Sequence, residues 1–265
     1  MITTSHDAAR STGTDPQMTS TATARDTPGA ITLPRSVQRA FRLHLVQWLQ
    51  TLSWPWGILG ISFVVNLAIF ASLGEEVAKD NGTGGLASIY IVIMIAYLQA
   101  ITQLFPFALG IGLSRRSFFL GTTAFALAES LLYGVLLYLC SVLEEATDGW
   151  GVALRFFRVP WVTDVGNAFG LIAIYTVPLF GMAAIAMALG GLHKRWGATG
   201  LLTLTAVASL VLGGSTALIT GQDGWKAFGD WFAGQTPLAI AAGWPLPIAA
   251  LALAGAWLTI RRATP

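Results

Sequence analysis

Six long apolar stretches, separated by short polar segments, are the feature of this sequence that most limits how it folds. The stretches cover about residues 54–73, 88–110, 118–141, 166–190, 198–220 and 237–260. Each is close to the roughly 20 residues that an α-helix needs to cross about 30 Å of hydrocarbon. Helices buried in soluble domains rarely stay uncharged over such lengths. We therefore expect an all-α, polytopic membrane protein with six transmembrane helices.

Composition agrees with a membrane location. Hydrophobic residues make up 54% of the chain and charged residues 11%, which is about half of the charged fraction usual in soluble domains. The ten Trp and five Tyr suit membrane interfaces, where an amphipathic ring is partly hydrated. The formal net charge is only +2, and its distribution does not indicate a nucleic-acid partner. Membrane lipid is the first partner that the composition predicts.

The basic residues alternate from one polar segment to the next. Every second segment is basic, and together these segments contain Arg35, Arg39, Arg42, Arg115, Arg116, Lys194, Arg195, Arg261 and Arg262. The segments between them are net acidic and contain Glu75, Glu76, Glu144, Glu145, Asp148, Asp223 and Asp230. Because cytoplasmic loops of membrane proteins are enriched in Lys and Arg, we expect the basic segments and both termini to be cytoplasmic.

The residues before the first apolar stretch form two regions. Residues 1–33 are rich in Ser, Thr, Asp and Pro and lack the apolar core of a secretory signal peptide, so we expect a disordered cytoplasmic tail. Residues 34–53 carry apolar side chains at helical spacing, at Val37, Phe41, Leu45, Trp48 and Leu52. This pattern predicts an amphipathic connecting helix on the inner leaflet. A short soluble helix is the alternative, which the direct turn into the first span disfavours.

Two of the acidic segments carry aromatic patterns. In residues 221–235 the aromatic side chains recur three and four apart, at Trp225, Phe228, Trp231 and Phe232. This spacing fits either a short helix dipping into the outer interface or an aromatic-belt loop. The segment after the third stretch contains Gly149, Trp150, Gly151, Phe156 and Phe157. This composition indicates local packing.

The sequence contains no recognisable catalytic constellation. Its three histidines, His6, His44 and His193, fall outside the apolar stretches, and Cys140 is its only cysteine. A Cys-ligated metal site is therefore excluded, and the acidic pairs at 75–76 and 144–145 are interpreted as solvated loop faces. The phosphate-binding pattern GxxxxGK[ST] is absent. We expect no catalytic residue, no metal and no cofactor in this chain, and hence no enzyme activity of its own.

Glu129 is the one charged residue deep within an apolar stretch. A charge at this depth costs about 2.5 to 3.5 kcal/mol on insertion scales, so the side chain should face other helices or water. One interpretation is contact with a substrate or a proton, and the other is a structural hydrogen bond between helices. No basic partner is apparent at the same depth, so the sequence leaves both open.

A short segment between the second and third stretches has a more specific pattern. Gly112, Leu113, Ser114, Arg115, Arg116, Phe118, Phe119 and Gly121 match G-[VIL]-[ST]-R-[RK]-x-[FY]-[FW]-x-G. This pattern resembles the segment between the second and third spans of small bacterial ABC-2 type transporter permeases. The order of elements from about residue 34 to residue 262 is also similar to that family. The segment with Trp150 and Phe156 resembles actinobacterial members, in agreement with twelve Arg against three Lys.

This resemblance implies the permease subunit of an ATP-driven exporter. In such a transporter two permease subunits form the path, and separate ABC ATPase subunits bind ATP and Mg on the cytoplasmic side. The coupling segment would consist of Ser114, Arg115, Arg116, Ser117 and Phe118. Ser114 would cap a short helix, and the Arg pair would meet acidic groups of the ATPase. The alternative is that the Arg pair only sets the topology. The loop typical of ABC importers is missing, which disfavours uptake.

Two other functions fit the same topology. One is a stand-alone secondary transporter or channel, and the other is a membrane anchor or sensor subunit that transports nothing. The substrate is not specified, although apolar helices would suit an amphipathic peptide, an antibiotic or a lipid. The second permease subunit could be identical or different. In each case the expected location is the bacterial plasma membrane.

Overall fold

The computed structural model describes residues 35–46, 48–73, 83–158, 165 and 167–262. The chain divides into two units, Met1–Leu33 and Pro34–Pro265, and all the described residues belong to the second. The predicted tail at 1–33 and the acidic pair at 75–76 therefore lie outside them. Within the described ranges the chain is all-helical and contains no β-strand.

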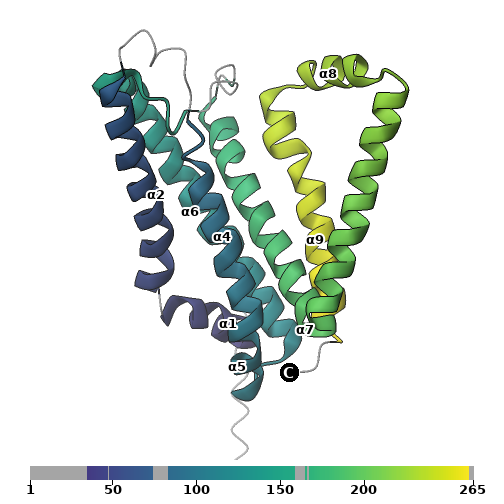
Figure 1. Cartoon of the computed structure of the whole chain (residues 1–265). Coiled ribbons are helices and arrows are strands. Elements are labelled where there is room, and N and C mark those ends of the chain that lie inside the picture. Colours follow the sequence, from purple (N-terminus) through teal and green to yellow (C-terminus); the bar gives the residue numbers. More distant parts are fainter. Residues whose placement is uncertain (1–34, 47, 74–82, 159–164, 166, 263–265) are drawn as a thin grey trace, which may run out of the picture. The chain divides into compact units, whose positions relative to one another are not determined.

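The described part of the second unit is a succession of α-helices (Figure 1) with short segments of π-helical hydrogen bonding, which are named η. In chain order the elements are α1 (Arg35–Val46), α2 (Trp48–Ser72), α4 (Ala87–Gln99), η1 (Ala100–Leu104), α5 (Phe105–Gly110), α6 (Arg115–Ala146), η2 (Gly149–Ala153), α7 (Ala168–Gly221), α8 (Trp225–Ala233), η4 (Ala239–Gly243) and α9 (Pro245–Ile260). The segment η2 leaves helical geometry at Trp150, Gly151 and Val152. Within residues 221–235 the structure has a short helix, α8, at Trp225–Ala233, while its contact with the outer interface stays a prediction.

Among the residues that the structure describes, five helical segments are long and apolar enough to cross a membrane. They are Ser53–Ser72, Ala87–Gly110, Arg115–Ala146, Ala168–Gly221 and Ala239–Ile260. They match the apolar stretches of the sequence, except that α7 contains both the fourth and the fifth. The backbone leaves helical geometry at Gly197, with φ 63° and ψ −152°, a conformation that essentially only glycine adopts. Figure 1 shows the two arms of α7 running in opposite directions from this break.

The first helix, α1, packs against the beginning of α6. Val37, Ala40 and His44 of α1 are buried, and Gly121 of α6 permits the close approach. A Cβ atom at Gly121 would lie only 3.0 Å from the Phe41 nitrogen. Since α1 ends at Val46 and α2 begins at Trp48, the helix boundary falls before the turn expected at residue 53. The contact of α1 with the inner leaflet stays a prediction.

Two of the apolar segments contain a π-helical turn just before a proline. The turn η1 precedes Pro106, and η4 precedes Pro245. Proline has no N–H to donate to the preceding turn, and its ring crowds the backbone there. A locally widened turn is one way in which membrane helices accommodate such a residue. In the segment that contains η1, the side chains of Gln99 and Gln103 are both exposed.

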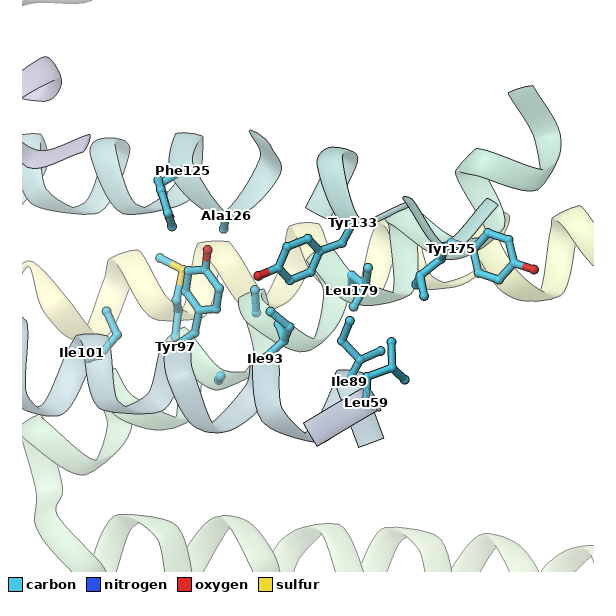
Figure 2. Close-up of a cluster of buried hydrophobic side chains, with 14 of the residues drawn as sticks. Leu59, Ile89, Ile93, Tyr97, Ile101, Phe125, Ala126, Tyr133, Tyr175 and Leu179 are labelled. Atoms are coloured by element: carbon cyan, nitrogen blue, oxygen red, sulfur yellow. The ribbon is translucent and has the colours of Figure 1, made fainter. Parts of the chain in front are cut away.

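The hydrophobic core lies between α2, α4, α6 and the first arm of α7. Figure 2 shows Leu59, Ile89 and Leu179 meeting in this core, and all three are at most 1% exposed. Small residues bring the helices close together. A Cβ atom at Gly134 of α6 would lie 3.1 Å from the Thr176 nitrogen of α7. The α6–α7 crossing therefore depends on a residue without a side chain.

Among the described residues, the basic segments and the acidic segment around α8 lie at opposite ends of the long helices. Arg115 Nη1 donates a hydrogen bond to the Arg261 carbonyl at 3.0 Å, which joins the beginning of α6 to the end of α9. Figure 1 places α1, α5 and the break in α7 at this same end, and α8 at the opposite end. The described acidic residues Asp223 and Asp230 flank or belong to α8. The alternation of basic and acidic segments along the sequence thus corresponds, in the described residues, to a basic end and an acidic end of the helices.

Candidate functional site

The predicted coupling segment forms a tight corner between α5 and α6. Gly112 has φ +86°, a left-handed conformation that favours glycine. Ser114 then caps α6, because its Oγ accepts a hydrogen bond from the Ser117 N–H at 3.1 Å. Such a cap satisfies one of the N–H groups that the first turn of a helix leaves unpaired. The cap was expected on a short helix, but α6 continues for 32 residues.

The corner divides the predicted segment into an exposed and a buried part. Ser117 and Phe118 are 7% and 0% exposed, so they support the corner from inside. Arg115 is half-buried and donates to the Arg261 carbonyl. Arg116 is exposed, beside the equally exposed Ser114. Arg116 is therefore the basic group of this segment that is most accessible to a partner protein.

The positions of Arg115 and Arg116 are unfavourable for α6 itself. The N-terminal end of an α-helix carries a partial positive charge, which stabilises acidic rather than basic side chains. Both guanidinium groups lie in the first turn of α6. Arg115 gains a partner in the Arg261 carbonyl, whereas no ion pair is found for Arg116 among the described residues. The stability of α6 does not explain Arg116.

Glu129 lies inside the protein, between α4 and α6. Its side chain is 5% exposed, and its Oε2 accepts a hydrogen bond from the Tyr97 hydroxyl at 2.6 Å. Tyr133 interacts with the same carboxyl group, and Figure 2 shows the two tyrosine hydroxyls pointing into one space. Within the described chain, Oε1 accepts no hydrogen bond. Glu129 thus makes the interhelical hydrogen bond that the sequence allowed, but uses only one of its oxygens.

A pocket of about 710 Å³ extends from Glu129 toward α1. Its wall combines residues of α1, α2, α4, η1, α5 and α6. Trp54 and Phe107 line it and are 67% and 57% exposed, so they mark its outer side. Gln99 and Gln103 contribute amide groups. This volume falls in the range of pockets that hold small molecules, about 300 to 1,000 Å³.

His44 also lines this pocket, which the sequence interpretation missed. Its side chain is 8% exposed, it shares a hydrogen bond with Thr122 Oγ1 at 3.1 Å, and its ring stacks on Phe125 at 4.7 Å. Burial lowers the pKa of His44 to about 4, so the ring is neutral at neutral pH. A signal was present in the sequence, since residues 37, 41 and 44 share one face of a helix.

Glu144 is a second buried carboxylate, at the far end of α6. It is 2% exposed, so its interpretation as part of a solvated loop face is wrong. Its oxygens accept hydrogen bonds from the N–H groups of Phe156, Phe157 and Arg158 at 2.8 to 2.9 Å. The Trp150 indole N–H donates to it at 3.2 Å. Glu144 therefore fixes the loop after α6, whose aromatic residues pack locally as expected.

Replacing Glu144 with glutamine should loosen this loop. Hydrogen bonds to a charged acceptor contribute about 1.5 to 3 kcal/mol each, and a loss of about 2 kcal/mol corresponds to roughly 30-fold faster local opening. Amide hydrogen exchange at Phe156 and Phe157 measures this opening. Glu145→Gln is the matched control, because the Glu145 side chain is 62% exposed in its ion pair with Arg158, and such pairs contribute little. Equal exchange in both variants would argue against the anchoring role.

Taken together, the fold and these sites define an all-helical protein with apolar helices long enough to cross a membrane and a buried carboxyl group between two of them. Among the described residues, no group of three or more His, Cys, Asp or Glu side chains is placed to hold a metal ion. Comparisons of the chain with protein-family models, curated proteins and solved structures gave no match.

Proposed function

We propose that the chain is the permease subunit of an ATP-driven ABC-2 type exporter in the bacterial plasma membrane. It would form the translocation path with a second permease subunit, and separate ABC ATPase subunits would supply the energy. The observation that carries this proposal is the corner between α5 and α6. Ser114 and Arg116 are exposed at this corner, which lies at the end of the helices where α5 ends (Figure 1), and its sequence resembles a segment of that family.

The corner is suited to transmit a movement. Gly112 and the Ser114 cap fix its backbone, while the buried Phe118 contacts Phe105 of α5, with ring centroids 5.3 Å apart. A force on the exposed Arg116 would therefore act on α5 and α6 together. An ATPase that binds this corner differently in its two nucleotide states would shift the equilibrium between two arrangements of the helices.

The apolar surface of the second arm of α7 indicates that lipid or another protein covers it along its length. Leu202, Leu210 and Leu218 are 70%, 76% and 66% exposed in the single chain. A helix with apolar side chains on every exposed face is stable only in hydrocarbon or against another chain. In an exporter this arm would contact membrane lipid, the second permease subunit, or both.

Six membrane crossings are part of the proposal. The 54 residues of α7 would rise about 81 Å as one helix, more than twice the roughly 30 Å of hydrocarbon. Two crossings joined at Gly197 would instead place Lys194 and Arg195 on the cytoplasmic side, together with both termini. The helix α8, with four half-exposed aromatic side chains, would then lie at the outer interface and α1 at the inner one.

Labelling of single cysteines tests these crossings. In a Cys140→Ser background, an impermeant maleimide applied to intact cells should label Asp223→Cys. The variants His193→Cys and Arg262→Cys should react only after the cells are permeabilised, because the proposed topology places both in the cytoplasm. All three native side chains are exposed, so each position is open to the reagent. Equal labelling of His193→Cys and Asp223→Cys in intact cells would refute the two crossings of α7.

One observation favours a second candidate, the stand-alone secondary transporter or channel. Glu129 and its pocket place an ionisable group inside the protein, as transporters driven by ion gradients do. Against this candidate, Glu129 is the only charged side chain among the described residues that line the pocket. The two functions differ in their partners, so isolation of the chain together with an ATPase distinguishes them. Flux driven by an ion gradient through the isolated chain would favour the second.

A further inference from the structure

The pocket beside Glu129 has the chemistry of a site for a positively charged amphiphile. Glu129 is its only acidic lining residue, and no Lys or Arg lines it among the described residues. His44 is neutral at neutral pH because burial lowers its pKa. A negative ligand would find no cationic partner here, whereas a positive ligand would meet the carboxyl group.

A second observation that points to a ligand is that Oε1 of Glu129 is unpaired within the described chain. The side chain is 5% exposed, its Oε2 is held by Tyr97, and its Oε1 has no hydrogen-bond partner within the described chain. Buried polar groups are nearly always satisfied, so an unpaired carboxyl oxygen indicates a missing partner. A carboxyl group within a membrane is typically paired or associated with a transport pathway.

The rest of the wall suits an apolar and aromatic body. The Phe125 ring is fixed between His44, at 4.7 Å, and Phe41, at 5.4 Å. Trp54 and Phe107 add two large apolar surfaces on the outer side. Aromatic faces attract cations, and they do so more strongly where water is excluded. The π-helical turn η1 lies directly on the pocket, as such turns often do at functional sites.

We propose that this pocket binds a lipophilic monovalent cation, such as an amphipathic amine or a quaternary onium ion. Its positive group would lie against the Glu129 carboxyl group, and its apolar body would contact Phe125, Trp54 and Phe107. As a substrate class, this ligand rests on the exporter function proposed above. The binding itself requires only this chain. The pocket extends from Glu129 to the end of the helices where α1 lies, so the ligand would enter from the inner leaflet.

Equilibrium binding of radiolabelled tetraphenylphosphonium to the purified full-length chain in lipid nanodiscs tests the proposal. We expect saturable binding by the natural chain and at least tenfold weaker binding by Glu129→Gln. The glutamine keeps the shape of the side chain and an acceptor for Tyr97, so it isolates the charge. Glu129→Asp should retain part of the affinity. Glu145→Gln, far from the pocket, should bind as the natural chain does.

Two further measurements keep the test decisive if Glu129→Gln does not fold. Tetraphenylborate has the same shape and the opposite charge, and it should not compete with the phosphonium. Phe107→Ala changes an exposed side chain and should weaken binding several-fold without affecting folding. Binding that is absent, unaffected by Glu129→Gln, or equally strong for tetraphenylborate would overturn the proposal. These outcomes would leave the association with an ATPase untouched, so failure of this inference and failure of the exporter assignment are separable.

Discussion

Valine in place of Gly134 should separate α6 from the first arm of α7 and destabilise the protein by about 3 kcal/mol, at the upper end of the usual cost of overpacking. The reason is geometric. A Cβ atom at this position would meet the Thr176 side chain and would lie 3.1 Å from the Thr176 nitrogen, so the backbone itself would have to move. Thermal unfolding in detergent, followed by tryptophan fluorescence, measures the loss.

Gly60→Val is the control for the change in side chain. Gly60 lies in α2, and a Cβ atom added to it would have no neighbouring atom within 4 Å, so a side chain there meets open space. Replacing a glycine within a helix even removes some of the conformational entropy lost on folding. Equal unfolding temperatures for the two variants would show that the close α6–α7 crossing is wrong.

If the chain is the proposed permease, reversing the charge of Arg116 should uncouple it from the ATPase. If acidic groups of the ATPase bind this guanidinium group, a glutamate would replace attraction by repulsion, which costs about 3 kcal/mol, or about 100-fold in affinity. The effect cannot be assigned to unfolding of α6, because an acidic residue in the first turn is favourable for a helix. The affinity of the purified chain for the ATPase and the rate of ATP hydrolysis are the two readouts.

Two variants separate coupling from topology. Arg116→Lys keeps the positive charge that orients the chain but loses the planar, bidentate guanidinium group, so it should weaken coupling and insert normally. Arg115→Gln removes the hydrogen bond to the Arg261 carbonyl and should mainly lower stability. If Arg116→Glu inserts correctly and still binds and stimulates the ATPase, the corner serves only to orient the chain.

Much of the helical organisation follows from the sequence, because hydrocarbon length sets the length of an apolar helix. The stretch predicted at 118–141 lies within α6, which extends beyond it at both ends. Its first turn is capped by Ser114, and its last turns include Glu144, which binds the following loop. The break at Gly197 was also visible, as a short basic segment between two stretches. The boundary between α1 and α2 was not, since apolar spacing alone continues across Val46 and Trp48.

The candidate site was predictable only in part. The free-energy cost of exposing a carboxyl group to lipid was enough to predict that Glu129 lies inside the protein. The cap at Ser114 followed from its residue type and its position before α6. The burial of Ser117 and Phe118 depends on the packing of α5 and α1 against α6, which no local pattern contains. His44 was missed because its neighbours on the helix face were interpreted as lipid contacts, whereas tertiary packing turned that face toward Thr122 and Phe125.

Isolation of the chain from the membrane of its own cells tests the permease assignment most directly. After mild solubilisation, affinity purification of the full chain should recover an equimolar ATPase that contains the GxxxxGK[ST] loop, and the complex should hydrolyse ATP. The same purification with Arg116→Glu should recover the chain with little or no ATPase. A chain that is recovered without any nucleotide-binding partner, and that carries ions across liposomes on its own, would contradict the assignment.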